Sequence, residues 1–237
     1  MAICYSAIPQ TRLGNNVPMA IIYNPLPKNN VFLRPRINVE QVSFYEDKLQ
    51  VTVTKSAQVV DQWLFKTLSH YGFKNLIIGL DIEWLPNLNP GEEDHPVATL
   101  QLCVDRHCLI FQLLHRDAMP VTLRDFLKNK NYYFVGVGVE DDAKKLLLHH
   151  GLVVSRTIDL NQLAFRKYNN HKFLRMGLKR LAKVILGKDM AKPRDITLSK
   201  WDAEVLNFEQ IEYGAIDAFV SSQLARALNN VNVQYFM

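Results

Sequence analysis

Cysteine is scarce in this chain of 237 residues, and its spacing argues against a thiolate metal site. The three cysteines are Cys4, Cys103 and Cys108, an odd number that lacks the paired spacing of zinc ligands. Cys103 and Cys108 could face each other across a hairpin, but in a reducing compartment free thiols are expected.

Signals for export and for membrane insertion are also lacking. Residues 1–9 have neither the charged start nor the long apolar centre of a signal peptide. No apolar run approaches the ~20 residues that a membrane-spanning helix needs. We therefore expect an intracellular protein, cytoplasmic or nuclear, with no membrane partner.

The motifs of several enzyme classes are missing as well. There is no serine or cysteine nucleophile motif, and the seven histidines show no metal-ligand spacing. Gly136–Gly138 suggests a dinucleotide-binding loop, but Asp141 replaces the third glycine, and the acidic residues there would repel a pyrophosphate. The pair His149 and His150, at a predicted helix end, is expected to be solvated.

Positive charge is concentrated in one part of the chain. The net charge is only +5, which is a mild hint of a polyanionic partner. Between residues 166 and 200, however, eleven basic residues are opposed only by Asp189 and Asp195. This segment is either the solvated face of one or two helices or a surface that contacts nucleic acid.

Hydrophobic patterning predicts an α/β domain after an irregular start. Residues 1–40 hold five of the ten prolines and are predicted to form a poorly ordered arm, and residues 41–237 form the domain. Predicted strands are Val42–Tyr45, Leu49–Thr54, Leu76–Trp84, Val97–Val104, His107–Leu113, Tyr132–Gly138 and Thr157–Leu160. Predicted helices are Ser56–His70, Glu140–His150, one that follows Leu160, Met176–Leu186 and Asn207–Asn229. This order predicts one central mixed sheet flanked by helices.

Acidic residues occur where the pattern predicts burial. Asp81 and Glu83 lie two apart in the apolar strand Leu76–Trp84 and so share a face. Buried carboxylates are costly unless compensated, and a divalent cation is the natural compensation. The alternative is that the strand end is solvated.

Two weaker acidic signals lie on helices. Tyr213 and Asp217 are four apart on the final helix and share a face, as many surface pairs also do. Glu140, Asp141 and Asp142 open a helix, where acids favour the helix dipole.

Together these residues resemble the three motifs of the DEDD superfamily of 3′–5′ exonucleases. Leu80–Trp84 resembles the first motif, DxEW, and Val135–Leu146 resembles the second, with Asp142 as its aspartate. Tyr213–Ala218 resembles the third, YxxxD, which marks the tyrosine subclass. The similarity spans roughly residues 76–228. It is greatest to Werner-type exonuclease domains, and among these to small stand-alone plant proteins that include the RISC-interacting exoribonucleases. Gly214 departs from the alanine common in the family and should loosen its helix by about 1 kcal/mol.

The resemblance implies an RNase H-like fold and metal-dependent hydrolysis of single-stranded nucleic acid from its 3′ end. Its implied catalytic residues are Asp81, Glu83, Asp142, Tyr213 and Asp217, of which the four carboxylates hold two Mg²⁺ or Mn²⁺ ions. Tyr213 would orient the attacking water, and the products would be nucleoside 5′-monophosphates. Implied nucleic-acid contacts are Trp84, Leu85, Lys179, Arg180, Lys192 and Arg194, with the 3′ end in a pocket near Leu85, Leu100 and the final helix.

The resemblance leaves the substrate and the partners open. RNA is preferred over DNA because no helicase accompanies the domain. A Werner-like DNA exonuclease in repair and a catalytically silent binding module are the alternatives. Relatives form rings, so a homo-oligomer is expected, as is a protein partner in RNA silencing or a helicase.

Overall fold

The structure is a computed structural model that describes residues 38–72, 75–87, 91, 94–191 and 193–229. Its strands are β1 (Asn38–Phe44), β2 (Asp47–Thr54), β3 (Leu76–Trp84), β4 (Val97–Val104), β5 (His107–Gln112), β6 (Tyr132–Gly136) and β7 (Thr157–Asp159). Its α-helices are α1 (Ala57–Tyr71), α2 (Val121–Lys128), α3 (Val139–His150), α4 (Leu160–Tyr168), α5 (Leu178–Leu181), α6 (Arg194–Thr197) and α7 (Phe208–Asn229). A 3-10 helix, η1 (His171–Arg175), and a π-helix, η2 (Ala182–Leu186), flank α5. The predicted arm lies outside the described residues, apart from its last three, which belong to β1.

The seven strands form one mixed sheet in the order β1-β2-β5-β4-β3-β6-β7. Strand β3 runs parallel to β6, and β6 runs parallel to β7, whereas β4 is antiparallel to both of its neighbours. Strand β2 is parallel to β5, and β1 closes the far edge as a hairpin with β2. The predicted central mixed sheet is therefore confirmed.

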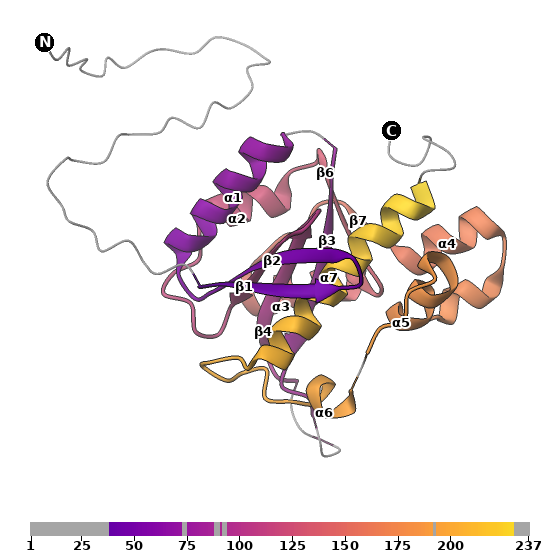
Figure 1. Ribbon diagram of the computed structural model, residues 1–237. Coiled ribbons are helices and arrows are strands. Elements are labelled where there is room, and N and C mark those ends of the chain that lie inside the picture. The colour runs from indigo at the N-terminus through magenta and orange to yellow at the C-terminus, as the bar shows by residue number, and fades with distance from the viewer. Residues whose placement is uncertain (1–37, 73–74, 88–90, 92–93, 192, 230–237) are drawn as a thin grey trace, which may run out of the picture. The chain divides into compact units, whose positions relative to one another are not determined.

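Each face of the sheet has its own hydrophobic core (Figure 1). One core joins the sheet to α4, α5 and α7, and the other joins it to α1, α2 and α3. All eight residues of β4 are buried, as expected of a central strand covered on both faces. Helix α2 was not predicted from the sequence.

The long helix α7 packs unusually close to β3. A Cβ atom on Gly79 would lie 1.7 Å from the carbonyl oxygen of Ala218, so only glycine lets the two backbones approach this far. The predicted cap, Asn207, directly precedes the helix: its side chain accepts a hydrogen bond from the Gln210 amide, and the Gln210 side chain accepts one from the Asn207 amide.

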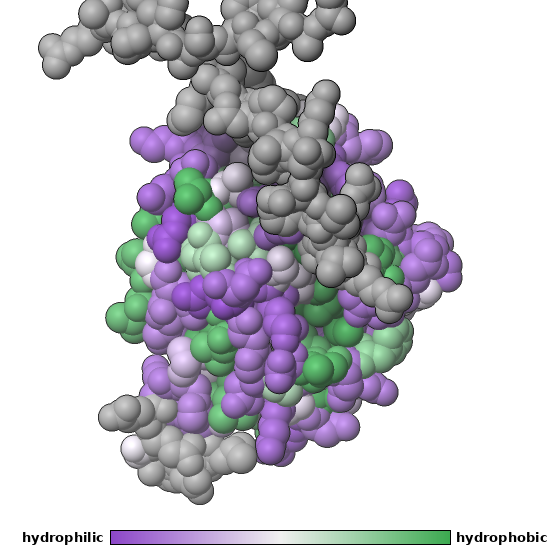
Figure 2. Space-filling view, turned by 90° about the vertical axis from the view of Figure 1, so that its left-hand side faces the viewer, coloured by the Kyte–Doolittle hydropathy of each residue, from purple (hydrophilic) through white to green (hydrophobic). Residues whose placement is uncertain are grey.

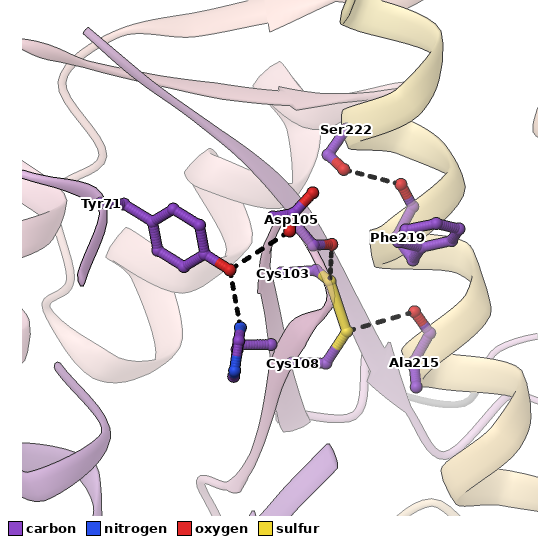
Figure 3. Close-up of a disulfide and its surroundings, with 8 residues drawn as sticks. Tyr71, Cys103, Asp105, Cys108, Ala215, Phe219 and Ser222 are labelled. Carbon is purple, nitrogen blue, oxygen red and sulfur yellow. Dashed lines mark hydrogen bonds between the residues drawn. A yellow bond between two sulfur atoms is a disulfide. The ribbon is translucent and has the colours of Figure 1, made fainter. Parts of the chain in front are cut away.

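The β4–β5 hairpin contains a disulfide between Cys103 and Cys108, which lie directly opposite each other in the register (Figure 3). Their Cα atoms are 4.1 Å apart. The prediction that these residues could face each other is confirmed, and the expectation of free thiols is wrong. Spacing alone could not reveal the pairing, because it depends on the strand register.

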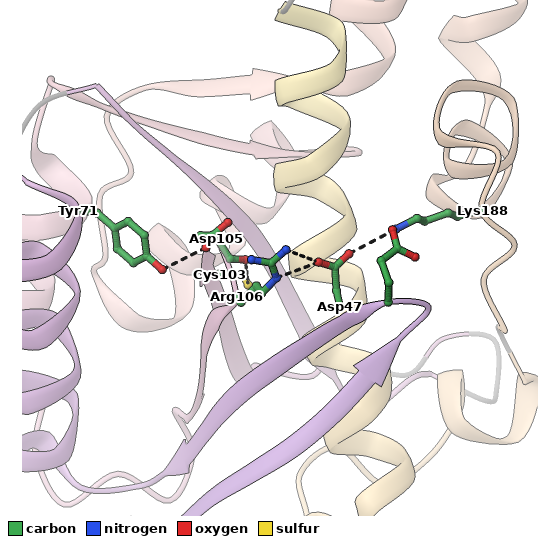
Figure 4. Close-up of polar contacts among 7 residues, drawn as sticks. Asp47, Tyr71, Cys103, Asp105, Arg106 and Lys188 are labelled. Carbon is green, nitrogen blue, oxygen red and sulfur yellow. Dashed lines mark hydrogen bonds and ion pairs between the residues drawn. The ribbon is translucent and has the colours of Figure 1, made fainter.

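Polar contacts tie the two hairpins to the segment after η2 (Figure 4). Arg106 in the β4–β5 turn donates two hydrogen bonds to the Asp47 carboxylate. Lys188 donates to the other oxygen of Asp47 at 3.3 Å and to Glu46 at 2.8 Å. One basic residue of the 166–200 segment therefore has a structural role rather than a free surface position.

The described surface mixes the two kinds of side chain. Figure 2 shows hydrophilic and hydrophobic residues interspersed over one face. Within the described ranges, no helix combines the length and apolarity needed to cross a membrane.

Candidate active site

The ends of β3, β6 and β7 meet at one edge of the sheet because these strands are parallel. Asp81 and Glu83 belong to the last part of β3, Asp142 to the first turn of the helix after β6, and Asp159 to the end of β7. Residues from three separate parts of the sequence therefore come to a single edge.

Asp81 and Glu83 point to the face of the sheet that α7 covers. Asp81 is opposite Gln101 in β4, and Glu83 is opposite Thr99. Both β4 side chains are fully buried, and Gln101 donates a 2.7 Å hydrogen bond to Thr99. The register between β3 and β4 shifts between Glu83 and Trp84. The two acids are half-buried, so they are neither enclosed in the core nor fully exposed to solvent.

Helix α7 brings Tyr213 and Asp217 to this face. A Cβ atom on Gly214 would lie 3.2 Å from the Gln101 side chain, and Ala218 touches Gly79. Because Gln101 is opposite Asp81 in the register, this part of α7 lies over that strand pair. Tyr213 is 7% exposed and Asp217 only 3%, so these two residues are not a surface pair.

Asp142 is placed by a turn of two glycines. A Cβ atom on Gly136 would lie 2.7 Å from the Leu80 carbonyl oxygen. The absence of a side chain at Gly136 therefore lets the end of β6 lie close to β3. Gly138 has φ 74°, a left-handed conformation that glycine tolerates, and it begins α3. Its amide donates a 2.7 Å hydrogen bond to Asp159.

Negative charge accumulates around Asp142. Burial first, and then the charges of Asp141 and Asp159, raise the pKa of Asp142 to about 7, while the charge of Lys145 opposes the rise. Asp141 is exposed and pairs with Lys144 at 2.7 Å. The helix-dipole role expected of at least one of the three acids therefore suits Asp141.

The donor set fits a hard divalent cation, which takes oxygen ligands. The raised pKa of Asp142 reflects charge that a cation would offset. Gln101 Oε1, beside Asp81, is buried and has no hydrogen-bond partner among the residues described. In the same described ranges, no three Asp, Glu, His or Cys side chains form a ready-made metal cage.

Three residues at this edge were missed by sequence reasoning. Asp159 accepts hydrogen bonds from the amides of Gly138, Asn161 and Gln162, so it fixes the turn before Asp142 and caps α4. Lys145 stands over the Trp84 ring with its Nζ 4.5 Å from the centroid. The aspartate before a helix was a visible capping signal, but its contact with Gly138 depends on sheet order.

The third is His150, which was expected to be solvated. It is 9% exposed, and its Nε2 lies 2.7 Å from the Val97 carbonyl oxygen. The Val97 amide in turn donates to His149 Nδ1 at 3.1 Å. His150 is buried because this part of α3 packs against the beginning of β4, so the expectation of solvent exposure for His150 is wrong.

A pocket of about 400 Å³ opens beside Tyr213 and Asp217. Its other lining residues are Ser43, Phe44, Tyr45, Asp189, Ala191, Pro193, Ile196, Glu209, Glu212 and Ile216. Leu85 is half-buried, but Leu100 is fully buried in the core on the α1 and α2 side. The predicted contact of Leu100 with a 3′ end is therefore wrong, since Leu100 faces away from Asp81.

The predicted nucleic-acid contacts differ in their surroundings. Lys179 and Arg180 on α5 and Arg194 on α6 are exposed, whereas Lys192 lies outside the described residues. Other basic residues of the segment form contacts with other groups of the protein. Lys183 pairs with Asp189 at 2.5 Å, and Lys167 donates to the Ala227 carbonyl at 2.8 Å.

Comparison with known proteins decides the family. The family model for 3′–5′ exonucleases matches residues 51–232, most of the chain. The chain belongs to this 3′–5′ exonuclease family. The RNase H-like fold expected from the motifs agrees with this membership.

Relatives of this exonuclease domain come from several organisms. A 3′-5′ exonuclease of Arabidopsis thaliana is 32% identical over 155 residues, which cover 65% of this chain and 53% of that protein. The human exonuclease 3′-5′ domain-containing protein 2 is 35% identical over 153 residues, covering 62% and 24%. The mouse bifunctional 3′-5′ exonuclease/ATP-dependent helicase WRN is 31% identical over 156 residues, covering 65% and 11%. The chain thus spans about half or less of the length of these relatives.

A solved structure is also similar in sequence. The crystal structure of the EXD2 exonuclease domain soaked in Mg and GMP is 31% identical to this chain, with a TM-score of 0.45. The match covers 76% of this chain and 88% of that one.

Proposed function

We propose that this chain is a divalent-metal-dependent 3′–5′ exonuclease that releases nucleoside 5′-monophosphates from single-stranded nucleic acid. The observation that carries the proposal is that α3 and α7 both pack against β3. Each of the three elements carries a buried or half-buried acid, Asp81, Asp142 and Asp217. Membership of the exonuclease family supports the same reaction.

Each side chain has a distinct role in this proposal. Asp81, Glu83, Asp142 and Asp217 hold two divalent cations, Mg²⁺ or Mn²⁺. When bound, such cations lower the pKa of a water molecule and stabilise negative charge on a departing 3′ oxygen. The hydroxyl of Tyr213, one helical turn before Asp217, orients the attacking water by a hydrogen bond. Trp84 and Leu85, which follow directly after Glu83, contact the terminal nucleotide.

The strand that enters the site would follow the exposed basic residues of α5 and α6. Lys179, Arg180 and Arg194 are exposed and make no ion pair among the described residues, which leaves them available to phosphates. Lys192 completes the set proposed from the sequence. We favour RNA as the substrate and propose DNA as the alternative.

A direct test compares two neighbouring aspartates on α3. Asp142→Asn removes a proposed ligand, while Asp141→Asn changes charge equally at an exposed residue that pairs with Lys144. Both variants and the wild type would be incubated with 5′-labelled single-stranded RNA and matching DNA, in Mg²⁺, in Mn²⁺ and in EDTA. The wild type should produce a ladder that shortens from the 3′ end only with the metals.

We expect Asp142→Asn to lose at least about 100-fold in rate, and Asp141→Asn to stay near the wild type. The faster wild-type substrate decides between RNA and DNA. If the wild type binds both labels but leaves them intact in every metal, the chain is a silent binding module. If both variants lose activity equally, Asp142 has no special role.

The homo-oligomer and the partner proteins, in RNA silencing or with a helicase, stay predictions of the family resemblance. Light scattering behind size exclusion would measure the first of these directly. A mass equal to that of one chain, 27.3 kDa, would contradict it.

A further inference from the structure

Lys145 is a basic side chain beside Asp142, one of the four acids of the proposed site. It lies three residues after Asp142 on α3, on the same face of the helix. Its ammonium group stands 4.5 Å from the centroid of the Trp84 ring, directly beyond Glu83. Only 26% of the Lys145 side chain is exposed. Its cation is therefore held at the carboxylate edge rather than spread into solvent.

The one ion pair that Lys145 makes among the described residues is weak. Its partner, Asp94, is 77% exposed, and the distance between Lys145 Nζ and Asp94 Oδ2 is 3.7 Å. Pairs of this kind contribute little because solvent screens them. A stronger anion could replace Asp94 without disturbing the packing of Lys145 on Trp84.

The chemistry of the site calls for such a cation. A phosphodiester that approaches four carboxylates meets like charge, and a lysine ammonium is a good point-charge partner for phosphate. Lys145 is the basic group whose charge acts on the Asp142 carboxyl. Its neighbour Lys144 is 74% exposed and is engaged with Asp141 at 2.7 Å, so it points to a different environment.

We propose that Lys145 binds a non-bridging phosphate oxygen of the nucleic acid at the carboxylate site, exchanging Asp94 for the substrate. The inference rests on the proposed function and adds a substrate-contacting residue to it. Trp84 holds the ammonium group in place, and Asp94 occupies it until the phosphate arrives.

The test uses the full chain with Lys145→Ala, Lys145→Arg and Asp94→Asn, and Lys144→Ala as the matched control. Two quantities are measured on one 5′-labelled single-stranded oligonucleotide. The first is kcat and KM in Mg²⁺. The second is equilibrium binding in EDTA between 50 and 200 mM salt, for which one lost phosphate contact lowers the slope of log K against log salt by about 0.7.

We expect Lys145→Ala to lower kcat/KM by about 10- to 100-fold and to reduce the salt slope by about 0.7. Lys145→Arg should recover most of both losses. Lys144→Ala should stay within about twofold of the wild type, and Asp94→Asn should bind at least as well as the wild type. Equal effects of Lys145→Ala and Lys144→Ala on kcat/KM and slope would overturn the inference.

A purely charge-balancing role gives a different result. Lys145→Ala would then lower kcat/KM in Mg²⁺ but keep the wild-type salt slope in EDTA, which also overturns the inference. Failure of the proposed function is recognised separately, because the wild type itself then degrades nothing. In that case the salt slopes still decide whether Lys145 contacts phosphate, and a wild type that binds no oligonucleotide at all overturns both proposals.

Discussion

Asp159 positions the backbone near Asp142, in contrast to the acids proposed as metal ligands. Its two carboxylate oxygens accept hydrogen bonds from three backbone amides. We predict that Asp159→Ala destabilises the fold by about 1–2 kcal/mol through the lost cap and the unsatisfied Gly138 amide. Nuclease activity should fall with it, because the Gly138 turn sets the position of Asp142.

Urea unfolding and nuclease rates would measure this effect, with Asp141→Asn as the control. Among the described residues, the ion pair of Asp141 is the exposed one with Lys144, so its loss should cost less than about 1 kcal/mol. Equal unfolding midpoints for Asp159→Ala and Asp141→Asn would show that the hydrogen bonds of Asp159 contribute nothing.

His150 makes stability depend on pH. Burial lowers its pKa below the usual value, the charges of Arg116 and His149 act in the same direction, and the Val97 carbonyl opposes them. Below a pH of about 6.5 the unfolded chain takes up a proton at this histidine, while the folded chain resists it. The unfolded state then binds more protons, so stability falls as pH drops from about 7 toward the lowered pKa.

The comparison is between the wild type and His150→Gln, each unfolded in urea at pH 7 and pH 5.5. The wild type should lose more stability between the two pH values than the variant, which has no group to protonate there. An identical loss in both proteins would remove His150 as a cause.

At the scale of elements, the close packing of α7 on β3 depends on two glycines with different tolerance. A methyl group on Gly79 would meet the rigid backbone of Ala218 at 1.7 Å, whereas one on Gly214 would meet the Gln101 side chain at 3.2 Å. Gly79→Ala should therefore cost at least about 3 kcal/mol. Gly214→Ala should stay within about 1 kcal/mol of the wild type, because the helix propensity gained offsets the displacement of Gln101.

Thermal and urea unfolding of the two alanine variants would measure the difference. Gly79→Ala should also lose activity, since α7 carries Tyr213 and Asp217. A Gly79→Ala protein as stable as Gly214→Ala would contradict the close approach of the two backbones.

Helices and strands with a clear local signal in the sequence were predicted, whereas the candidate site was predicted only in part. The apolar run of β3 and the cap at Asn207 are local signals, and both elements are confirmed. The orientation of Leu100 needed the register that places Asp81 opposite Gln101. The contact of Lys188 with Asp47 joins residues 141 positions apart, so no local pattern could show that this lysine is engaged. The disulfide likewise depended on the pairing of β4 with β5.

At the scale of the whole molecule, positive charge is uneven, and this asymmetry matters more than the net value of +5. Asp47, Asp189 and the Ala227 carbonyl engage part of the basic segment. The exposed remainder includes Lys179 and Arg180 on α5. Helix α5 contains no acidic residue, so no charge within the helix competes with a polyanion for these two side chains.

The double change Lys179→Ala with Arg180→Ala should therefore weaken binding of single-stranded nucleic acid and reduce its salt slope by about 1.4, about 0.7 for each lost phosphate contact. The matched control is Lys55→Ala with Lys66→Ala, which removes the same amount of positive charge elsewhere. Lys66 lies in α1, and Lys55 precedes this helix. The slope of this control should stay near the wild type, because Lys55 pairs with Glu204 and Lys66 lies on a different helix. Fluorescence anisotropy between 50 and 200 mM salt measures both. Equal slopes for the two double variants would mean that net charge alone attracts the substrate, and that α5 does not guide the strand.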